Sequence, residues 1–289
     1  MTRRELLLLA TAAPLARAQF TSSVRVVNVY VTVRDRKGEL VRGLTRDDFE
    51  VREDSRKQEL RYFTAESDAP LTLGLLFDLS GSQRSVVEEQ RHASQDFLKQ
   101  VLRDGDTAFF VAFDKNVRLF NAGQLTEIQP GFANSTGTAL FDAISRACEH
   151  VRDEPGRKTL VILSDGVDTA STATINEAIT AAQRSNVSIF PIRFYDREVF
   201  RFIVPSPALD NLRAGQKALE KLARDTGGGM YEISDKQTLA DNYAKMQREL
   251  RSQYSLGYTP ADGKSGYRKL KVTVKRKDLR VQARDGYFA

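Results

Sequence analysis

The middle of the chain alternates short apolar runs with segments whose apolar residues recur at helical spacing. Leu71–Phe77 is almost entirely apolar, which is typical of a strand covered on both faces. Ser85–Leu102 then carries apolar residues every three or four positions, the pattern of an amphipathic helix. The alternation continues to residue 250, with strands expected at Thr107–Phe113, Val117–Phe120, Thr159–Leu163, Val187–Ile192 and Met230–Ile233 and helices at Ala139–Val151, Ile175–Arg184, Ala214–Arg224 and Thr238–Leu250. This order predicts an α/β fold, a doubly wound, mostly parallel sheet with helices on both faces.

Two β-rich flanks enclose this middle segment. Every second residue from Val27 to Val33 is valine, which indicates a half-buried strand. Further strands are expected at Phe49–Val51, Leu60–Phe63, Tyr254–Tyr258, Leu270–Val274 and Leu279–Ala283. Neither flank is long enough to bury a core by itself. We therefore infer that residues 19–66 and 253–289 pair into one small β-sandwich-like module, with the α/β domain of residues 70–252 inserted between them.

The first 18 residues have the layout of a signal peptide. Arg3 and Arg4 precede the apolar stretch Leu6–Leu9, and Ala16-Arg17-Ala18 provides a small-x-small cleavage site. The arginine pair resembles a twin-arginine export signal, and a Sec signal that carries two arginines is the alternative. The apolar stretch is too short to span a bilayer, and no later segment is long and apolar enough. We expect an exported protein, periplasmic or extracellular, with no transmembrane segment in the mature chain.

Charge and cysteine content change this picture little. The formal net charge is +6, and removal of the first 18 residues lowers it to +4, an excess that weakly favours acidic partners. The densest basic run, Lys269–Lys277, alternates with apolar residues, so we interpret it as the solvent face of a strand and expect no nucleic-acid binding. The single cysteine, Cys148, lies on an expected buried helix face and can form no internal disulfide.

A set of oxygen-bearing side chains directly follows the first buried strand. Asp78-Leu79-Ser80-Gly81-Ser82 offers one carboxylate and two hydroxyls on alternate residues. In doubly wound folds, ligands bind at the carboxyl ends of the strands, where the strand order reverses. Hard cations such as Mg²⁺ prefer oxygen ligands of this kind and usually keep several waters. The pattern therefore indicates a cation site.

Two later loops carry residues that the same cation would need. Thr138 lies in a loop that opens an expected helix, and Asp165 follows the strand Thr159–Leu163. Because the carboxyl ends of parallel strands share one edge of a sheet, we expect these loops to converge with the first one. The candidate metal ligands are Asp78, Ser80, Ser82, Thr138 and Asp165.

With these residues in place, the middle segment resembles a von Willebrand factor type A (vWA) domain. The five residues match the metal-ion-dependent adhesion site of that family, D-x-S-x-S followed by a threonine and an aspartate in two later loops. The resemblance implies a Rossmann-like sheet that holds one divalent cation, Mg²⁺ or else Mn²⁺ or Ca²⁺. It also implies a protein partner that completes the coordination with an acidic side chain. Gly43–Phe49 and Gly286–Phe288 add a resemblance, over nearly the whole mature chain, to acidobacterial vWA-related proteins.

Simpler interpretations of single residues remain open. Asp78 by itself could cap a helix, and Asp165-Gly166 by itself could form a turn. Asp168 could either support the third loop from behind the cation or be a solvated loop acid. Gly227-Gly228-Gly229 lacks the lysine of a phosphate-binding loop, so a turn is the better interpretation.

The sequence favours binding over catalysis. It contains no G-x-S-x-G or H-E-x-x-H motif. Its two histidines, His92 and His150, are expected on helix surfaces among charged residues. We therefore expect a non-enzymatic protein that binds a divalent cation and mediates adhesion or another protein interaction. The alternatives are a scaffold in which the cation is purely structural and a magnesium-dependent phosphoryl-transfer enzyme.

The double substitution Arg3→Lys with Arg4→Lys tests the export route. The precursor should stay inside the cell if the twin-arginine route is used, because that route reads the arginine pair. Immunoblotting of cell fractions measures the retained precursor. Normal export of this variant would point to Sec. Charged residues placed within Leu6–Leu9 should block both routes, and export of that second variant would contradict the signal peptide.

Overall fold

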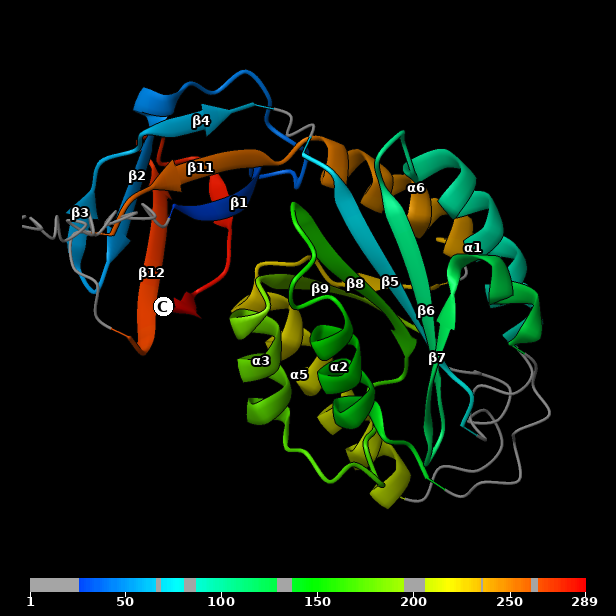
Figure 1. Cartoon of the computed structure of the whole chain (residues 1–289). Helices are drawn as coiled ribbons and strands as arrows, with labels where there is room; N and C mark the ends of the chain where they lie inside the picture. The colour runs from blue at the N-terminus through cyan, green and yellow to red at the C-terminus, as the bar shows by residue number, and fades with distance from the viewer. Residues whose placement is uncertain are drawn as a thin grey trace, which may run out of the picture.

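The computed structural model describes residues 26–65, 69–80, 87–128, 137–194, 206–234, 236–260 and 265–289. The expected signal peptide and Ser82 lie outside the described residues. Three sheets organise the described part of the chain (Figure 1). One is large and flanked by helices, and two are small and antiparallel.

The largest sheet has six strands in the order β10-β9-β8-β5-β6-β7. Neighbouring strands are parallel except for β7, which pairs with β6 in the antiparallel sense. The strands are β5 Leu71–Asp78, β6 Thr107–Phe113, β7 Val117–Asn121, β8 Arg157–Ser164, β9 Val187–Arg193 and β10 Tyr231–Glu232. The chain builds outward from β5 to β7 and then returns to the other side of β5 for β8. The strand order therefore reverses between β5 and β8, which confirms the doubly wound α/β fold.

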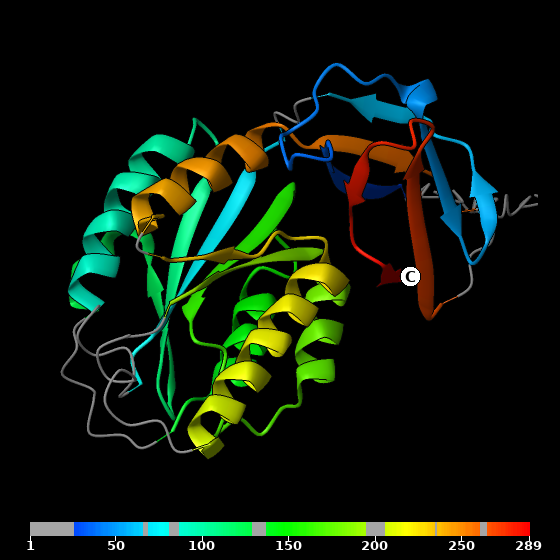
Figure 2. The ribbon, with the colours of Figure 1, turned by 180° about the vertical axis from the view of Figure 1, so that it is seen from behind.

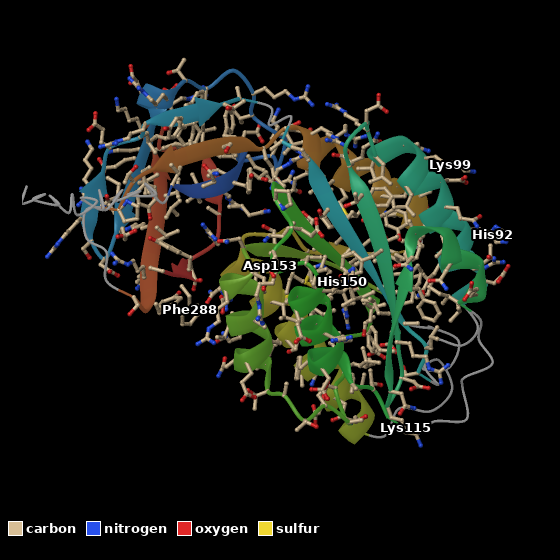
Figure 3. The ribbon with its side chains drawn as sticks, in the orientation of Figure 1. His92, Lys99, Lys115, His150, Asp153 and Phe288 are labelled. Carbon is tan, nitrogen blue, oxygen red and sulfur yellow. The ribbon has the colours of Figure 1, made fainter. Side chains whose placement is uncertain are left out.

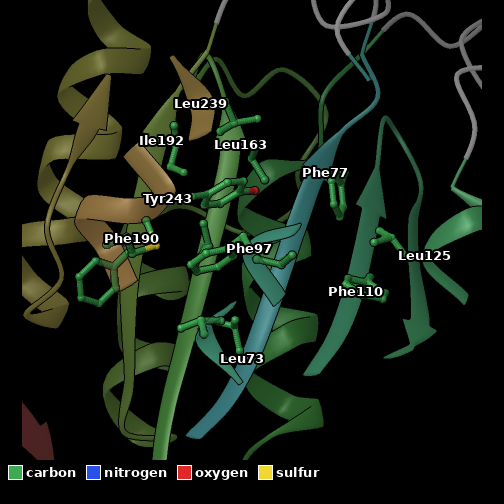
Figure 4. Close-up of a cluster of buried hydrophobic side chains, with 14 of the residues drawn as sticks. Leu73, Phe77, Phe97, Phe110, Leu125, Leu163, Phe190, Ile192, Leu239 and Tyr243 are labelled. Carbon is green, nitrogen blue, oxygen red and sulfur yellow. The ribbon is translucent and has the colours of Figure 1, made fainter. Parts of the chain in front are cut away.

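Helices cover both faces of this sheet (Figures 1 and 2). On one face, α1 and α6 pack together through Phe97 and Tyr243, whose stacked rings have centroids 4.2 Å apart (Figure 4). On the other face, α2, α3 and α5 bury Cys148 completely, as predicted, and burial raises the pKa of its thiol to about 12. No helix of the described residues is long and apolar enough to cross a membrane. The helices are α1 Val87–Val101, α2 Leu140–His150, α3 Ile175–Arg184, α5 Ser206–Thr226 and α6 Leu239–Arg251, with short 3₁₀ helices at Arg46–Asp48 and Ala122–Glu127.

Two four-stranded antiparallel sheets form the β module, with the orders β13-β1-β11-β4 and β14-β12-β2-β3. The strands are β1 Val27–Arg34, β2 Phe49–Glu53, β3 Arg56–Gln58, β4 Tyr62–Thr64, β11 Tyr254–Tyr258, β12 Tyr267–Val274, β13 Arg280–Gln282 and β14 Gly286–Phe288. Each sheet combines strands from both flanks of the chain. Val29 and Val31 of β1 are fully buried in one core with Val51, Leu256 and Leu270. The two flanks therefore form a single sandwich-like unit, as the valine pattern predicts.

Several elements differ from the sequence prediction in their bounds. The helix expected at Ala214 begins at Ser206, because proline is favourable in the first turn of a helix and Pro207 does not delay its start. The strand expected at Leu270 begins at Tyr267, where residues 267–269 pair with β14. The sequence predicts neither β14 nor β3. Both are three-residue strands, which are too short to show a clear alternation.

A buried carboxylate joins the last helix to the β module. Glu249 of α6 is 0% exposed and forms an ion pair with Arg34 of β1. Its carboxylate also accepts hydrogen bonds from Thr32 Oγ1 at 3.2 Å and from Gln282 Nε2 at 2.7 Å. The hydroxyl of Tyr231 in β10 donates to the same group at 2.5 Å. The large sheet, the last helix and both flanks of the module thus meet on one side chain.

Glu249→Ala should destabilise the protein by about 3 kcal/mol, because it leaves the partners of a buried carboxylate without an acceptor. Urea unfolding followed by circular dichroism measures the change. Glu149→Ala is the matched control, since Glu149 also lies in the last turn of a helix but is 59% exposed beside Arg146. Its cost should stay below about 1 kcal/mol. Equal costs for the two variants would contradict the structural role of Glu249.

Candidate metal centre

The register of β5 against β8 places two polar side chains next to each other at the strand ends. Phe77 pairs with Leu163, so that Asp78 and Ser164 end the two strands side by side. Ser164 Oγ donates a hydrogen bond to Asp78 Oδ2 at 2.6 Å and accepts one from the Gly166 N–H at 3.0 Å. The serine hydroxyl therefore connects the first loop to the third. Ser164 is not among the candidate residues predicted from the sequence, although it lies directly before Asp165-Gly166 at the end of the expected strand.

Asp78 and Asp165 are buried together at this edge, 0% and 3% exposed. Burial, followed by the negative charge of Asp165, raises the pKa of Asp78 to about 7. Hydrogen bonds from Ser164 and Ser80 oppose this rise. Two carboxylates held close together away from water destabilise each other's charged forms. A divalent cation between them would offset that cost.

Ser80 is placed by the turn that follows β5. Its N–H donates to Asp78 Oδ1 at 3.0 Å, and its side chain also forms a hydrogen bond with the Asp78 carboxylate. The N–H of Leu79 donates to the Phe113 carbonyl at 2.7 Å and extends the contact between β5 and β6 by one residue. Ser80 is therefore buried beside Asp78, at 5% exposure.

Thr138 reaches the same edge from the loop before α2 and is 7% exposed. Its N–H donates to Thr169 Oγ1 at 3.0 Å, and its carbonyl accepts from the N–H groups of Thr169 and Ala170 at 2.9 and 3.0 Å. The next residue, Ala139, donates to the Asp114 carbonyl directly after β6 at 2.7 Å. Backbone hydrogen bonds thus hold Thr138 between the end of β6 and the third loop.

Asp168 and Ser171 of the third loop cap the start of α2. Asp168 Oδ2 accepts hydrogen bonds from the Phe141 N–H at 3.1 Å and from Ser171 Oγ at 2.5 Å. Ser171 Oγ in turn accepts from the N–H groups of Phe141 and Asp142 at 3.0 and 3.1 Å. Of the two interpretations of Asp168, the structure supports the one in which it supports the loop. By capping α2, it fixes the helix that follows Thr138.

The turn after Asp165 requires glycine. Gly166 has a φ of +84°, and a Cβ there would lie 2.4 Å from the carbonyl oxygen of Gly215 in α5. Asp165 Oδ1 accepts a hydrogen bond from the Val167 N–H at 3.0 Å. Glycine at position 166 therefore allows the loop that carries Asp165 to pass close to α5.

The donor chemistry of this edge fits a hard divalent cation. Asp78 and Asp165 supply carboxylates, and Ser80 and Thr138 supply hydroxyls. Oxygen ligands of this kind suit Mg²⁺, Mn²⁺ and Ca²⁺. In the described part of the chain, no group of three or more His, Cys, Asp or Glu side chains is arranged so that it could hold a metal ion, and the candidate set itself contains only two carboxylates. Coordination by these residues stays a prediction.

Both histidines lie on helix surfaces, as predicted (Figure 3). His92 of α1 is 65% exposed, with its Nε2 3.0 Å from a carboxylate oxygen of Glu88. His150 ends α2, with its ring 4.8 Å from that of Phe109. Since Thr138 precedes the first residue of α2, His150 lies at the opposite end of that helix from the candidate site.

Comparisons with known proteins give low-identity structural likenesses. No family model matches the chain, and no curated protein matches it. The chain is similar to the conserved hypothetical protein BatB from Bacteroides thetaiotaomicron, with 14% identity, a TM-score of 0.47 and coverage of 62% of this chain and 97% of that one. It is also similar to an aerotolerance-related membrane protein from Bacteroides fragilis, with 12% identity, a TM-score of 0.45 and coverage of 62% of this chain and 98% of that one. A von Willebrand factor type A structure from Catenulispora acidiphila has 13% identity, a TM-score of 0.49 and coverage of 91% of this chain and 73% of that one. Because these identities and TM-scores are low, the fold is assigned from the strand order of the chain itself.

Proposed function

We propose that this chain is an exported, non-enzymatic vWA-type protein that binds one divalent cation and, through it, an acidic group of a protein partner. The cation would be held by Asp78, Ser80, Ser82, Thr138 and Asp165. The observation that carries the proposal is the buried pair Asp78 and Asp165 at the point where the strand order of the sheet reverses.

The charge balance of the site supports a binding role. A divalent cation neutralises the two carboxylates, and the remaining ligands in the set are neutral hydroxyls. Mg²⁺ in proteins usually keeps several waters, and a water can give way to a carboxylate of the partner. The partner's carboxylate would then replace a water on a cation whose charge is already balanced, so the interaction would be reversible.

The position of the site also favours a partner protein. β5 follows the module and runs for eight residues, or about 25 Å, before it reaches Asp78. The candidate site and the β module are therefore at opposite ends of the sheet (Figure 1). The module does not cover the edge that a partner would approach.

Export is proposed from the first 18 residues. Their arginines, short apolar stretch and small-x-small site have the layout of a signal peptide. We place the mature protein in the periplasm or outside the cell, where an adhesion or scaffold role would operate.

Asp78→Asn separates cation binding from folding. Mg²⁺ should stabilise the wild type by about 2.7 kcal/mol at a hundredfold excess over its Kd, and this gain should vanish in the variant. Without the cation, the variant should be at least as stable as the wild type, because one of two buried like charges is gone. Differential scanning fluorimetry with Mg²⁺ or with a chelator measures both quantities. The control is Asp278→Asn, a half-exposed aspartate of the module. A variant that responds to Mg²⁺ as the wild type does would contradict the ligand set.

Thr138→Val distinguishes adhesion from a structural cation. The hydrogen bonds that place Thr138 come from its backbone, and valine keeps the side-chain shape. We expect the variant to keep the melting temperature of the wild type in chelator and to bind Mg²⁺ more weakly. A partner that the wild-type protein captures from an envelope extract in the absence of chelator, and not in its presence, should no longer be captured by the variant. Thr273→Val, at an exposed position of β12, is the control. Unfolding of Thr138→Val would instead support the structural role of the cation.

A further inference from the structure

A cavity of about 210 Å³ lies between the β module and the inserted domain. Its polar lining comes from both parts, with Asn28, Tyr30 and Arg284 from the module and Lys158 and Asn186 from the inserted domain. A smaller pocket of about 20 Å³ shares Asn28, Tyr30, Asn186 and Arg284 with it. Phe288, which also lines the larger cavity, lies at the edge of the module that faces α3 (Figures 1 and 3). The cavity is thus at the amino end of β8, the opposite end of the sheet from the candidate metal centre.

Two basic residues, Lys158 and Arg284, line this cavity, and a third, Arg157, lies near its Tyr30. Arg157 and Lys158 begin β8 and are 2% and 7% exposed. Arg284 precedes β14, and burial of its guanidinium lowers its pKa to about 10. Burial also lowers the pKa of Lys158. In the described part of the chain, no carboxylate forms an ion pair with any of the three.

These three side chains have N–H groups that form no hydrogen bond within the described part of the chain. Lys158 Nζ donates to the Arg152 carbonyl at 2.9 Å. Arg284 donates from Nη2 to the Asn28 carbonyl at 2.8 Å and from Nη1 to the side chain of Asn186. Among the described residues, Arg284 Nε and Arg157 Nη2 have no acceptor. Each of the three side chains is held in place with at least one N–H still to satisfy.

The ring of Tyr30 lies among these charges. Arg157 Cζ is 5.9 Å from the ring centroid. Burial raises the pKa of the Tyr30 phenol, and the positive charges of Arg157 and Arg284 oppose that rise. Glu154 is the one carboxylate among the described residues that line the cavity, and it is exposed to solvent. The carboxylates of Asp153 and Glu154 act on Lys158, and that of the buried Asp106 acts on Arg157, whereas the groups that act on Arg284 are tyrosines.

Buried basic side chains almost always have an acidic partner, because an unpaired charge away from water is costly. We propose that the cavity supplies that partner from solution, by binding a small oxyanion, a phosphate or a carboxylate, between Arg284 and Lys158. Arg157 adds positive potential from across the Tyr30 ring. Because Arg284 belongs to the module and Lys158 to the inserted domain, the bound anion also joins the two parts.

Calorimetric titration of the mature chain in chelator tests this site with inorganic phosphate, sulfate and malonate as the probes. We expect one binding site, and the preference between phosphate and malonate identifies the class of anion. Lys158→Met and Arg284→Gln should each weaken binding by about tenfold or more, the loss expected for a charge-assisted hydrogen bond. Lys271→Met, which removes an exposed lysine of β12, should leave the affinity unchanged.

Melting temperatures without anion distinguish binding from a structural role. Lys158→Met should melt no lower than the wild type, because it removes a buried ammonium without an ion pair. The proposal is overturned if none of the three anions binds, as when water alone fills the cavity. It is also overturned if both cavity variants bind as the wild type does, or if Lys271→Met weakens binding as much as they do. Chelator keeps these outcomes independent of the metal centre.

Discussion

Two carboxylates buried side by side at the ends of neighbouring strands are the constraint around which the inserted domain is arranged. Asp78 and Asp165 would repel each other in a site without water, and several contacts hold their loops in place. Ser164 connects their loops, and Gly166 lets the third loop pass close to α5. Asp168 then fixes that loop to the helix that follows Thr138. A cation site needs acidic oxygens that are held in place in this way, whereas a simple turn does not need them.

The opposite end of the sheet is organised by charge as well. Glu249 is satisfied by side chains from β1, β10 and β13. Arg157 and Lys158 are buried there, and neither they nor the partly buried Arg284 form an ion pair among the described residues. α6 follows β10 and ends at Arg251, with Glu249 in its last turn beside the module. Its 13 residues span about 20 Å. The last helix therefore runs to the junction and reaches the module through Glu249.

The sequence predicts the inserted sheet well, because strands covered on both faces read as continuous apolar runs. β5 and β8 are buried at every position. The ends of these strands, and so the candidate loops that follow them, can therefore be located from the sequence alone. Asp78, Ser80, Thr138 and Asp165 could be assigned to one edge for this reason. The valines of β1 likewise predict that the flanks need each other, although the pattern does not show that β1 lies between β11 and β13.

What the sequence does not reveal depends on partners distant in the chain. β14 exists because residues 267–269 pair with it, and its own three residues carry no periodic signal. Glu249 resembles a surface charge in composition, and only its helical register with Tyr243, Met246 and Leu250 indicates a buried face. Arg157 and Lys158 begin a strand and look like ordinary solvated ends. Their burial follows from the module that packs over them.

A crystal structure of the mature protein grown with Mn²⁺ shows whether the edge formed by β5, β6 and β8 binds a cation. Anomalous scattering identifies the ion independently of the atomic positions. We expect one strong peak between the loops of Asp78 and Thr138, within bonding distance of Ser80 and Ser82 oxygens and linked to Asp165 directly or through water. No peak there at saturating Mn²⁺, or a peak only at another site, would contradict cation binding at this edge.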